Sequence, residues 1–428
     1  MIWKFSPSLV FVWLWMASAS SATAQTFSHA LPTSVQPGTT SVINVYGAGL
    51  ANAKTLWTTF PATVTLAPGT TPTDTQAAFQ VTVPADAAVG MFGVRVVTDS
   101  GISDGRPWVV DDLPIVVEAG NNVSIDQAQA VNLPVAVDGV IAGETSDYYS
   151  FNVVAGQRLA FEVVGNRLGA GLDPLVRILG PDKREIVSHD NDEGLGFDVR
   201  FEHVFKDAGT HYLEVRDTRY QGGGNWTYHL RMGDFPIARV AYPAGGTRGR
   251  WVSIAFPGRT ATDVVPMNTQ VTANPIEEVL QIPAKGGNSS AWVPFVLDDQ
   301  DQQLELEPND DLPLANAFIP GRTLNGRLQA RGDVDYFRFT ATKGQAILFA
   351  ADTKRISSPV DLYLRVLNRQ GGEVAVMDDA GTEDAKFTFT APEDGEYTLV
   401  VEELNRRGGL EFIYRILTQP APVDYSLL

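Results

Sequence analysis

Residues 107–112 read PWVVDD, and residues 294–299 read PFVLDD, so an apolar run that ends in two aspartates occurs twice, 187 residues apart. Downstream, DYYSF at residues 147–151 returns as DYFRF at residues 335–339, which keeps the spacing to within one residue. A nearly constant offset over so long a stretch indicates an internal duplication. We therefore expect a unit that is built twice in tandem.

Each unit divides into two kinds of module, which we call A and B. The two B copies are similar along their whole length, whereas the A copies share less sequence and the second of them is shorter. The predicted organisation is a signal peptide at residues 1–24, module A1 at 26–113, module B1 at 114–233, module A2 at 234–300, module B2 at 301–418 and a C-terminal tail at 419–428.

Short segments rich in apolar and β-branched residues run through the modules, as in SVINVY at 41–46, RLAFEVV at 158–164 and LYLRVL at 362–367. Clusters of Gly, Pro, Asn and Asp separate them, and the 39 Gly and 26 Pro leave little room for long helices. Many short strands between turns favour sheets packed face to face. The predicted fold class is all-β, a tandem array of antiparallel β-sandwiches.

The N-terminus has the three parts of a secretory signal peptide. Lys4 gives a positive start, residues 9–16 (LVFVWLWM) are apolar, and residues 22–24 (ATA) form a small-residue cleavage site. The apolar run is shorter than the roughly 20 residues of a bilayer span, and no later segment is long and apolar enough to be one. We expect cleavage before Gln25 and a mature chain that is secreted, periplasmic or on the cell surface. An uncleaved N-terminal anchor is the alternative.

The chain is acidic, with 50 Asp and Glu against 32 Lys and Arg in 428 residues and a net charge of −18. Such a chain repels nucleic acid, which excludes that class of partner, and it suits hard cations such as Ca²⁺. It contains no cysteine, which excludes disulfides, zinc–thiolate sites and cysteine nucleophiles. Its small domains must therefore be stabilised by well-packed cores, by oligomerisation or by a bound metal.

Modules B1 and B2 resemble the bacterial pre-peptidase C-terminal domain family. Module A is similar to immunoglobulin-like IPT/TIG domains, and the A–B tandem looks like exported proteins of planctomycete-type bacteria. The segments that carry the B-module resemblance are, in B2, residues 305–310 (ELEPND), 332–337 (GDVDYF), 359–364 (PVDLYL) and 394–397 (DGEY), and in B1, residues 146–149 (SDYY), 156–157 (GQ), 172–174 (LDP) and 189–192 (HDND).

The resemblance implies a jelly-roll-like β-sandwich for each B module. Domains of this family accompany secreted peptidases and other exported proteins, where they are thought to assist secretion, solubility or substrate binding, and some relatives bind Ca²⁺. The sequence shows no peptidase domain, so the resemblance implies an association with proteolysis rather than proteolytic activity.

Module B2 holds the candidate metal site, a set of oxygen-bearing side chains: Glu305, Glu307, Asn309, Asp310, Asp333 and Asp335. The first four lie in a linker, and the last two begin a strand across a turn. Ca²⁺ takes six to eight oxygen ligands, and in Ca²⁺-binding relatives this linker folds against the strand start. The alternative is a solvated acidic linker whose Asn309 and Asp310 cap turns.

Module B1 departs from this pattern at half of its positions. Gly120, Val123 and Thr145 stand where B2 has acidic side chains, so we expect no such metal site in B1. A second acidic cluster in B1, residues 190–193 with Asp198, resembles only part of an EF-hand loop. We interpret it as a polar hairpin tip.

No catalytic motif is present: the sequence has neither a G-x-S-x-G elbow nor an H-E-x-x-H pair. The histidines are interpreted as structural or surface residues because they fall on unrelated turns and strands: His29, His189, His203, His211 and His229. The tryptophans that might stack on sugars are interpreted as core residues because they stand singly: Trp57, Trp226, Trp251 and Trp292. We therefore expect no enzyme activity.

These observations predict an exported, non-catalytic accessory or interaction protein whose B2 module is stabilised by Ca²⁺. Its partner is expected to be an extracellular protein or polysaccharide. Two alternatives stay open. One is a polysaccharide-binding protein of the cell surface, and the other is a peptidase-associated protein or a hydrolase with an unrecognised carboxylate site.

Overall fold

The computed structural model describes residues 25–192, 195–258, 264, 266–271, 278–287, 289–377 and 384–421. The predicted signal peptide lies outside the described residues, as does most of the predicted C-terminal tail. The described elements are strands and single turns of 3-10 helix, which confirms the all-β fold class. No helix in the described part of the chain has the length and hydropathy needed to cross a membrane.

Module A1 is a two-sheet sandwich. One sheet has the order β1-β3-β6-β5 and the other the order β2-β9-β7-β4, with β8 added to β7. Their bounds are β1 Thr26–Leu31, β2 Ser34–Val35, β3 Thr40–Ala48, β4 Ala53–Thr58, β5 Thr63–Leu66, β6 Gln76–Thr82, β7 Gly90–Thr98, β8 Gly101–Ile102 and β9 Arg106–Val110. Alternating residues such as Val45, Phe79 and Val94 point between the sheets and are fully buried.

Module B1 is a sandwich of two five-stranded sheets, β10-β12-β19-β14-β17 and β11-β13-β18-β15-β16. Its elements are β10 Ile115–Val117, η1 Ile125–Gln127, β11 Gln129–Ala130, β12 Val135–Val140, β13 Asp147–Val153, β14 Arg158–Val164, η2 Asn166–Leu168, β15 Pro174–Leu179, β16 Glu185–Asp190, β17 Val199–Val204, β18 Gly209–Asp217 and β19 Thr227–Gly233. The core between the sheets is rich in aromatic and β-branched residues.

Module B2 repeats the topology of B1 strand for strand, with sheets β25-β27-β34-β29-β32 and β26-β28-β33-β30-β31. Its elements are β25 Gln302–Leu304, η4 Leu312–Leu314, β26 Asn316–Ala317, β27 Thr323–Arg327, β28 Val334–Ala341, β29 Ala346–Asp352, η5 Lys354–Ile356, β30 Leu362–Asn368, β31 Glu373–Met377, β32 Lys386–Thr390, β33 Gly395–Glu403 and β34 Ile413–Pro420. The shared strand order is the structural counterpart of the sequence repeat.

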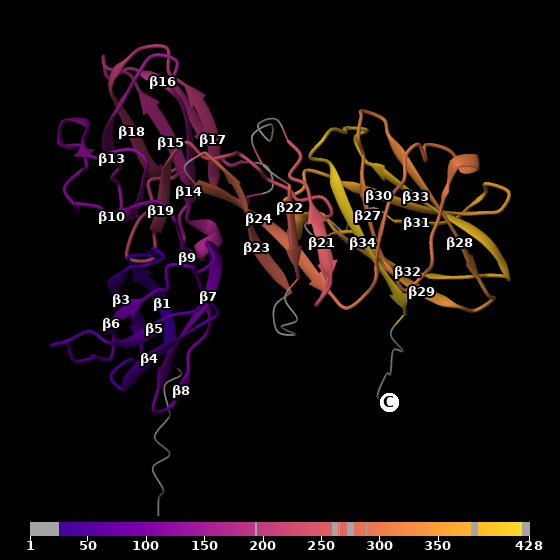
Figure 1. The fold of residues 1–428 in the computed structure, drawn as a ribbon, viewed down its shortest axis with the longest axis horizontal. Helices are drawn as coiled ribbons and strands as arrows, with labels where there is room; N and C mark the ends of the chain where they lie inside the picture. The colour runs from indigo at the N-terminus through magenta and orange to yellow at the C-terminus, as the bar shows by residue number, and fades with distance from the viewer. Residues whose placement is uncertain are drawn as a thin grey trace, which may run out of the picture.

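Module A2 is smaller than A1. It has a three-stranded sheet, β20-β24-β23, and a two-stranded sheet, β21-β22. Their bounds are β20 Gly245–Thr247, β21 Trp251–Ile254, β22 Met267–Gln270, β23 Val279–Gly286 and β24 Ser289–Asp298. Figure 1 shows A2 between the two B sandwiches, with A1 below B1 at the left and B2 at the right. The exact boundaries of the four modules stay a prediction.

The joint between A1, B1 and A2 is buried and charged. Arg231 on β19 pairs with Asp111, which follows β9, and with Glu162 on β14, and all three side chains are inaccessible to solvent. Trp292 on β24 of A2 lies over the Arg231 guanidinium, 4.1 Å from its ring centre. The first three modules are therefore held together by ion pairs and packing rather than by flexible linkers alone.

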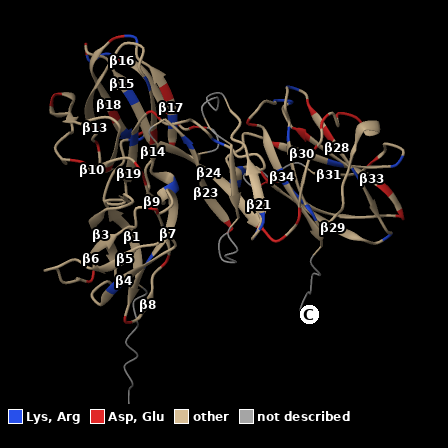
Figure 2. Cartoon of the chain, viewed as in Figure 1, with Lys and Arg blue, Asp and Glu red and all other residues tan. Residues whose placement is uncertain are grey.

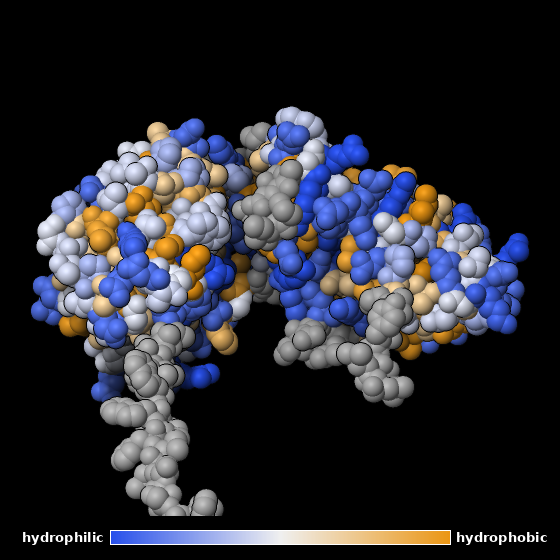
Figure 3. All heavy atoms as spheres, turned by 90° about the horizontal axis from the view of Figure 1, so that it is seen from below, coloured by the Kyte–Doolittle hydropathy of each residue, from blue (hydrophilic) through white to orange (hydrophobic). Residues whose placement is uncertain are grey.

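The interpretation of the tryptophans as core residues is correct for two of them. Trp292 is 1% exposed, and Trp226 packs against the B1 core. It is wrong for Trp57 and Trp251, which are 45% and 72% exposed. Trp57 lies on the edge strand β4, and Trp251 lies on the small β21-β22 sheet, so neither faces the interior of a sandwich. On the face in Figure 3, apolar residues form small separate groups rather than one continuous patch.

Candidate metal centre

The acidic linker of B2 runs from the end of β25 toward η4 in an extended conformation. Consecutive side chains of an extended segment point to opposite sides, so Leu306 faces solvent while Glu305 faces the sandwich. The side chain of Asn316 holds this segment in place, because its Oδ1 accepts from the Leu306 N–H at 2.6 Å and its Nδ2 donates to the Leu306 carbonyl at 2.9 Å. Figure 2 shows acidic residues beside β28.

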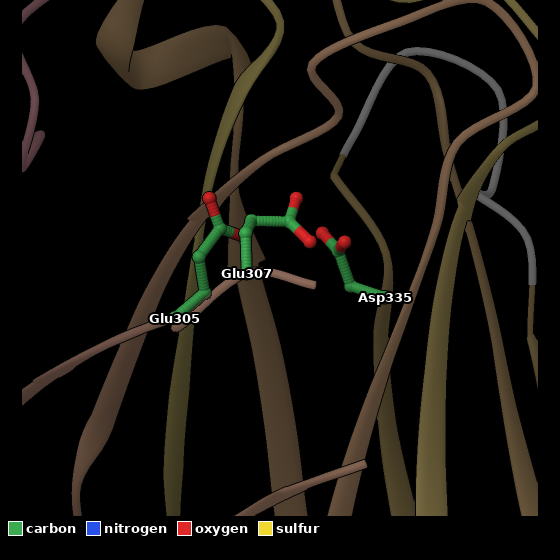
Figure 4. A group of neighbouring side chains, drawn as sticks. All are labelled: Glu305, Glu307 and Asp335. Carbon is green, nitrogen blue, oxygen red and sulfur yellow. The ribbon is translucent and has the colours of Figure 1, made fainter. Parts of the chain in front are cut away.

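Three carboxylates form an inner group at this place. One oxygen each from Glu305, Glu307 and Asp335 lies within 4.8 Å of the other two. Figure 4 shows the three side chains converging, two from the linker and Asp335 from the start of β28. Asp335 is fully buried and Glu305 is 8% exposed. The fold therefore brings two buried carboxylates and the exposed Glu307 together from two separate segments of B2.

Hydroxyl and amide groups surround the inner group. The Tyr414 hydroxyl donates to Asp335 Oδ2 at 2.6 Å and lies 3.4 Å from Glu305 Oε2, which also accepts from the Arg327 N–H at 2.9 Å. The Tyr242 hydroxyl, from module A2, lies 3.4 Å from Glu305 Oε1. Tyr414 and Tyr242 were not among the predicted site residues, although Tyr414 stands at a position that B1 repeats as Tyr228.

Burial raises the pKa of both inner carboxyls. The pKa of Asp335 rises to about 10 because the group is desolvated and lies beside Glu305, and the Tyr414 hydrogen bond offsets this only in part. The pKa of Glu305 rises to about 7, again chiefly by desolvation. Among the described residues, no Lys or Arg forms an ion pair with either group, and the charge of Arg327 lowers the pKa of Glu305 less than burial raises it. The pair thus lacks a positive partner.

An outer group shares Glu307 with the inner one. Oxygens of Glu307, Asp310 and Asp333 lie within 4.8 Å of one another, with Glu307 and Asp310 exposed and Asp333 partly exposed. These residues line a shallow pocket together with Arg331 and Gln329. Each group could hold a metal ion, and the two groups share the Glu307 carboxylate.

Asn309 is fully buried beside the inner group. In the amide orientation that satisfies both of its atoms, its Nδ2 donates to Asp335 Oδ1 at 3.2 Å and to Glu307 Oε2 at 2.9 Å. The main-chain carbonyl of Asn309 also accepts from the Tyr336 N–H at 3.0 Å. Asn309 therefore joins the linker to β28, and its amide nitrogen, which is not a metal ligand, faces the carboxylates.

All six predicted residues come together in the structure, and the donors that face one another are carboxylate oxygens. Ca²⁺ prefers such hard, anionic oxygens and tolerates irregular geometry. Nitrogen and sulfur donors, which zinc and copper favour, are absent from these two groups. The residues present fit Ca²⁺ as the group they would hold.

Module B1 keeps the inner half of this arrangement. Tyr228 donates to Asp147 Oδ2 at 2.8 Å and lies 3.3 Å from Glu118 Oε2, as Tyr414 does in B2. The hydroxyl of Tyr149 also contacts that of Tyr228, whereas B2 has Phe337 at the matching position. Burial raises the pKa of Asp147 to about 8.

The outer positions of B1 differ from those of B2, as the sequence indicated. Gly120, Val123 and Thr145 supply no carboxylate, and no group of three candidate ligands forms among the described residues of B1. Asn122 is fully buried and neither polar atom of its side chain has a hydrogen-bond partner. The absence of a metal site in B1 stays a prediction.

The interpretation of the second acidic cluster as a polar hairpin tip is wrong for Asp198, which is fully buried. Glu193 lies outside the described residues. Asp198 is buried and accepts from the N–H groups of Gly165, Asn166 and Arg167 at 2.9, 2.7 and 3.2 Å, which closes the η2 turn. Asp192 pairs with Arg239 at 2.7 Å. The corresponding B2 residues 378–383 lie outside the described part of the chain, whereas Asp384 holds η5 in the same way.

His229 is the buried histidine that most resembles a catalytic group, because it lies between two carboxylates. Its Nε2 is 2.8 Å from Asp111 Oδ2 and its Nδ1 is 2.7 Å from Asp138 Oδ1. Burial alone would lower the pKa of His229, but Asp138 and Asp111 together raise it to about 9. The ring is inaccessible to solvent, so no substrate can reach it and its role is structural.

Comparison with known proteins gives a family match within the second B module. Residues 333–403 match the bacterial pre-peptidase C-terminal domain family. A stretch of 102 residues is 32% identical to a probable subtilase-type serine protease of Deinococcus radiodurans, and it covers 23% of this chain and 14% of the protease. The chain therefore spans about a seventh of the length of this curated relative.

Two solved structures are among those that match parts of this chain. The pre-peptidase C-terminal domain of a Bacillus anthracis collagenase is 18% identical, covers 24% of this chain and 94% of that chain, and has a TM-score of 0.21. The SGBP-B protein of a Bacteroides ovatus mixed-linkage glucan utilization locus, in complex with a mixed-linkage heptasaccharide, is 10% identical, covers 86% of this chain and 71% of that chain, and has a TM-score of 0.16.

Proposed function

We propose that the protein is an exported, non-catalytic accessory protein whose B2 module binds Ca²⁺ through Glu305, Glu307, Asp310, Asp333 and Asp335. The observation that carries this proposal is the buried pair Glu305 and Asp335, which has no ion-pair partner among the described residues. A buried carboxylate that lacks a partner is costly to ionise. A bound divalent cation would allow both groups to ionise and would bind the linker to the sandwich.

The accessory role rests on the family match and on the wider architecture. The matched segment includes the start of β28, where Asp333 and Asp335 stand. B1 is proposed to be a second domain of the same kind, since its strand order is identical, and the A modules are proposed to be IPT/TIG-like. Export follows from the proposed signal peptide. The expected partner is an extracellular protein or polysaccharide.

Thermal unfolding with EDTA and with Ca²⁺ tests the metal claim. A ligand present at a hundred times its Kd stabilises the folded state by about 2.7 kcal/mol, which in a domain of this size raises Tm by roughly 5 °C or more. Glu307→Gln removes the carboxylate that both groups share and should abolish the rise. Glu118→Gln in B1, which changes the counterpart of Glu305, should leave the rise unchanged. The same Tm in EDTA and in Ca²⁺ would exclude a stabilising metal.

A polysaccharide-binding role is the second candidate, and the exposed Trp251 favours it. Indole rings that face solvent offer a flat apolar surface on which sugar rings can stack. Binding to insoluble glycans, compared between the wild type and Trp251→Ala, tests this role. The variant should lose retention on the glycan that the wild type binds, and failure of the wild type on a broad panel would rule the role out.

A further inference from the structure

The small β21–β22 sheet of A2 (Figure 1) has one face against the core of the module and the other face in solvent. Ile254 is fully buried, and Val252 and Met267 pack against the A2 core. Because side chains alternate along a strand, the residues between these positions point outward. The outward residues are exposed, and they are Trp251, Ser253, Asn268 and Gln270.

The strand register joins these four side chains into one surface, which we call the A2 face. Trp251 lies opposite Gln270, and Ser253 lies opposite Asn268. Residues that are directly opposite each other in an antiparallel pair have their side chains on the same side of the sheet. With a rise of about 3.3 Å per residue and strands about 4.8 Å apart, the A2 face has the footprint of a monosaccharide or disaccharide.

The A2 face combines an aromatic ring with uncharged polar groups. Trp251 is 72% exposed, so most of its indole is open to solvent. The Gln270 Nε2 donates to the Gly249 carbonyl at 3.1 Å, which holds this amide in place. Within the described part of the chain, Ser253 and Asn268 form no side-chain hydrogen bond. The face therefore offers a ring for stacking together with free donors and acceptors.

A neutral sugar matches this chemistry. A pyranose ring has a face of C–H groups and a rim of hydroxyls, so it can stack on an indole while amides beside the indole bond to the hydroxyls. None of the four side chains carries a charge that could pair with a carboxylate or a sulfate, and the net charge of −18 repels polyanions. A site for a protein partner would surround the tryptophan with apolar side chains rather than with amides and a hydroxyl.

Module A1 lacks such a face at the equivalent place. Counted from Leu31-Pro32 of A1 and Tyr242-Pro243 of A2, Thr40 stands where A2 has Trp251. The Thr40 hydroxyl lies 2.8 Å from the hydroxyl of Thr82, its partner on β6. The polar groups of A1 therefore bond to each other within the sheet, and the aromatic ring is a feature of A2 alone among the two modules.

We propose that the A2 face binds a neutral polysaccharide, with Trp251 stacked on a sugar ring and Ser253, Asn268 and Gln270 bonded to its hydroxyls. This inference rests on the polysaccharide-binding role proposed above, to which it adds a class of ligand and a binding surface. A small and open surface gives a weak single contact. The expected ligand is therefore a polymer, which offers many equivalent binding positions.

Affinity electrophoresis of the native chain, in gels that contain a soluble polysaccharide, tests the proposal. The neutral probes are mixed-linkage β-glucan, xylan and galactomannan, and the anionic probes are alginate and polygalacturonate. At least one neutral polymer should retard the wild type, and neither anionic polymer should do so. Trp251→Ala should lower the association constant by about tenfold or more, and Asn268→Ala and Gln270→Ala should each lower it by about three- to tenfold.

Trp57→Ala supplies the matched control. Trp57 is also an exposed tryptophan on a strand, but it lies opposite the charged Arg95, so its loss should leave the retardation unchanged. Trp251→Phe keeps a ring that can stack and should recover part of the affinity that Trp251→Ala loses. Thermal unfolding like that of the wild type shows that each variant is folded.

Three results would count against the proposal, and they differ in what they leave standing. Retardation that persists in Trp251→Ala, Asn268→Ala and Gln270→Ala would overturn the A2 face as the site while the polysaccharide-binding role stands. Retardation by the anionic polymers alone would overturn the neutral class of ligand. A wild type that no polymer retards would remove the polysaccharide-binding role itself and this inference with it.

Discussion

At the scale of single residues, the candidate metal centre is decided by burial. Asp335 and Glu305 are carboxyls placed where water does not reach, and Tyr414 satisfies only part of their hydrogen-bonding capacity. Without a cation the folded state holds a neutral Asp335 over most of the pH range, because its pKa is raised to about 10. Metal binding and protonation therefore compete for the same oxygen atoms.

This competition predicts opposite effects of Asp335→Asn with and without metal. An acid whose folded pKa lies above its unfolded value destabilises the folded state as pH rises above the unfolded value. In EDTA at pH 7, Asp335→Asn should therefore raise the unfolding free energy by roughly 1–3 kcal/mol. In Ca²⁺ it should remove the metal-dependent stabilisation. Thermal unfolding under both conditions measures the two effects.

Asp147→Asn in B1 provides the comparison. Because burial also raises the pKa of Asp147, this variant should stabilise the chain in EDTA. It should leave the response to Ca²⁺ as in the wild type. A wild-type Ca²⁺ response in Asp335→Asn would show that the metal does not use this carboxylate.

His229 makes the stability of the joint between A1, B1 and A2 depend on pH. Its folded pKa of about 9 lies above its ordinary value of 6.5, because Asp138 and Asp111 favour the charged ring more than burial disfavours it. The stabilisation is complete below about pH 6.5 and is lost as pH rises through about 9. We expect a loss of a few kcal/mol between pH 7 and pH 10.

Urea unfolding at several pH values, in wild type and in His229→Gln, measures this loss. The variant should be less stable at pH 6 and should show a much smaller decrease toward pH 10. B2 contains Arg415 at the equivalent position, and a guanidinium stays charged throughout this range. A B2 transition that weakened in parallel would point to another titrating group.

At the scale of elements, the short turns η2 and η5 differ in the contacts that stabilise their free N–H groups. Each follows a strand and needs acceptors for its free N–H groups. Asp198 and Asp384 provide them, and Asp198 also pairs with the Arg167 guanidinium at 2.6 Å. Arg167 is partly buried and bridges to Glu162, whereas Lys354 and Arg355 of η5 are exposed.

The two capping aspartates should therefore differ in their contribution to stability. Asp384→Ala removes hydrogen bonds at an exposed turn and should cost about 1–2 kcal/mol. Asp198→Ala also leaves the partly buried Arg167 guanidinium with one partner fewer and should cost about 2–4 kcal/mol. Denaturant unfolding of the two variants gives the comparison. Equal costs would mean that the Arg167 pair contributes nothing net.

The hairpins that precede β18 and β33 show a second difference between the copies. The Tyr397 hydroxyl donates to the Glu393 carbonyl at 2.9 Å, which is the arrangement of a tyrosine corner. In B1 the equivalent residue is His211, whose Nδ1 lies 3.2 Å from the Gly209 carbonyl. At this place in the fold the side chain that bonds to the turn is thus the phenol of Tyr397 in B2 and the imidazole of His211 in B1.

At the scale of the whole molecule, three modules share one buried joint and the fourth does not. A1, B1 and A2 are connected through Arg231, Asp111 and Trp292, so the loss of one exposes charges of the others. B2 meets A2 through a separate apolar cluster that includes Val296, Ile356 and Ile413, and through the ion pair of Arg415 with Asp298. Cooperativity in unfolding follows the extent of such interfaces.

Calorimetry should therefore resolve two transitions. One belongs to A1, B1 and A2 together, and the other to B2. Ca²⁺ should raise the temperature of the second transition alone, and Trp292→Ala should lower the first by the equivalent of about 3–5 kcal/mol. A single transition that moves as a whole with both perturbations would show that the chain unfolds as one cooperative body.

The sequence alone determined the features that depend on local pattern. The repeat at 187 residues, the all-β class and the six candidate site residues of B2 follow from spacing, composition and motif. The matching strand orders of B1 and B2 agree with the repeat. A strand of alternating apolar and polar residues, or a turn residue, is specified by its immediate neighbours in the sequence. Such features can therefore be predicted from the sequence alone.

Only the tertiary structure decided which of these features are buried and what they meet. Glu305 meets Tyr414 across 109 positions, and Arg231 meets Asp111 across 120. Such pairs depend on how whole sheets stack and how modules dock. The exposure of Trp57 and Trp251 and the amide of Asn309 turned toward the carboxylates both arise in this way. Local sequence carries no signal for a contact whose partner is set by the packing of another module.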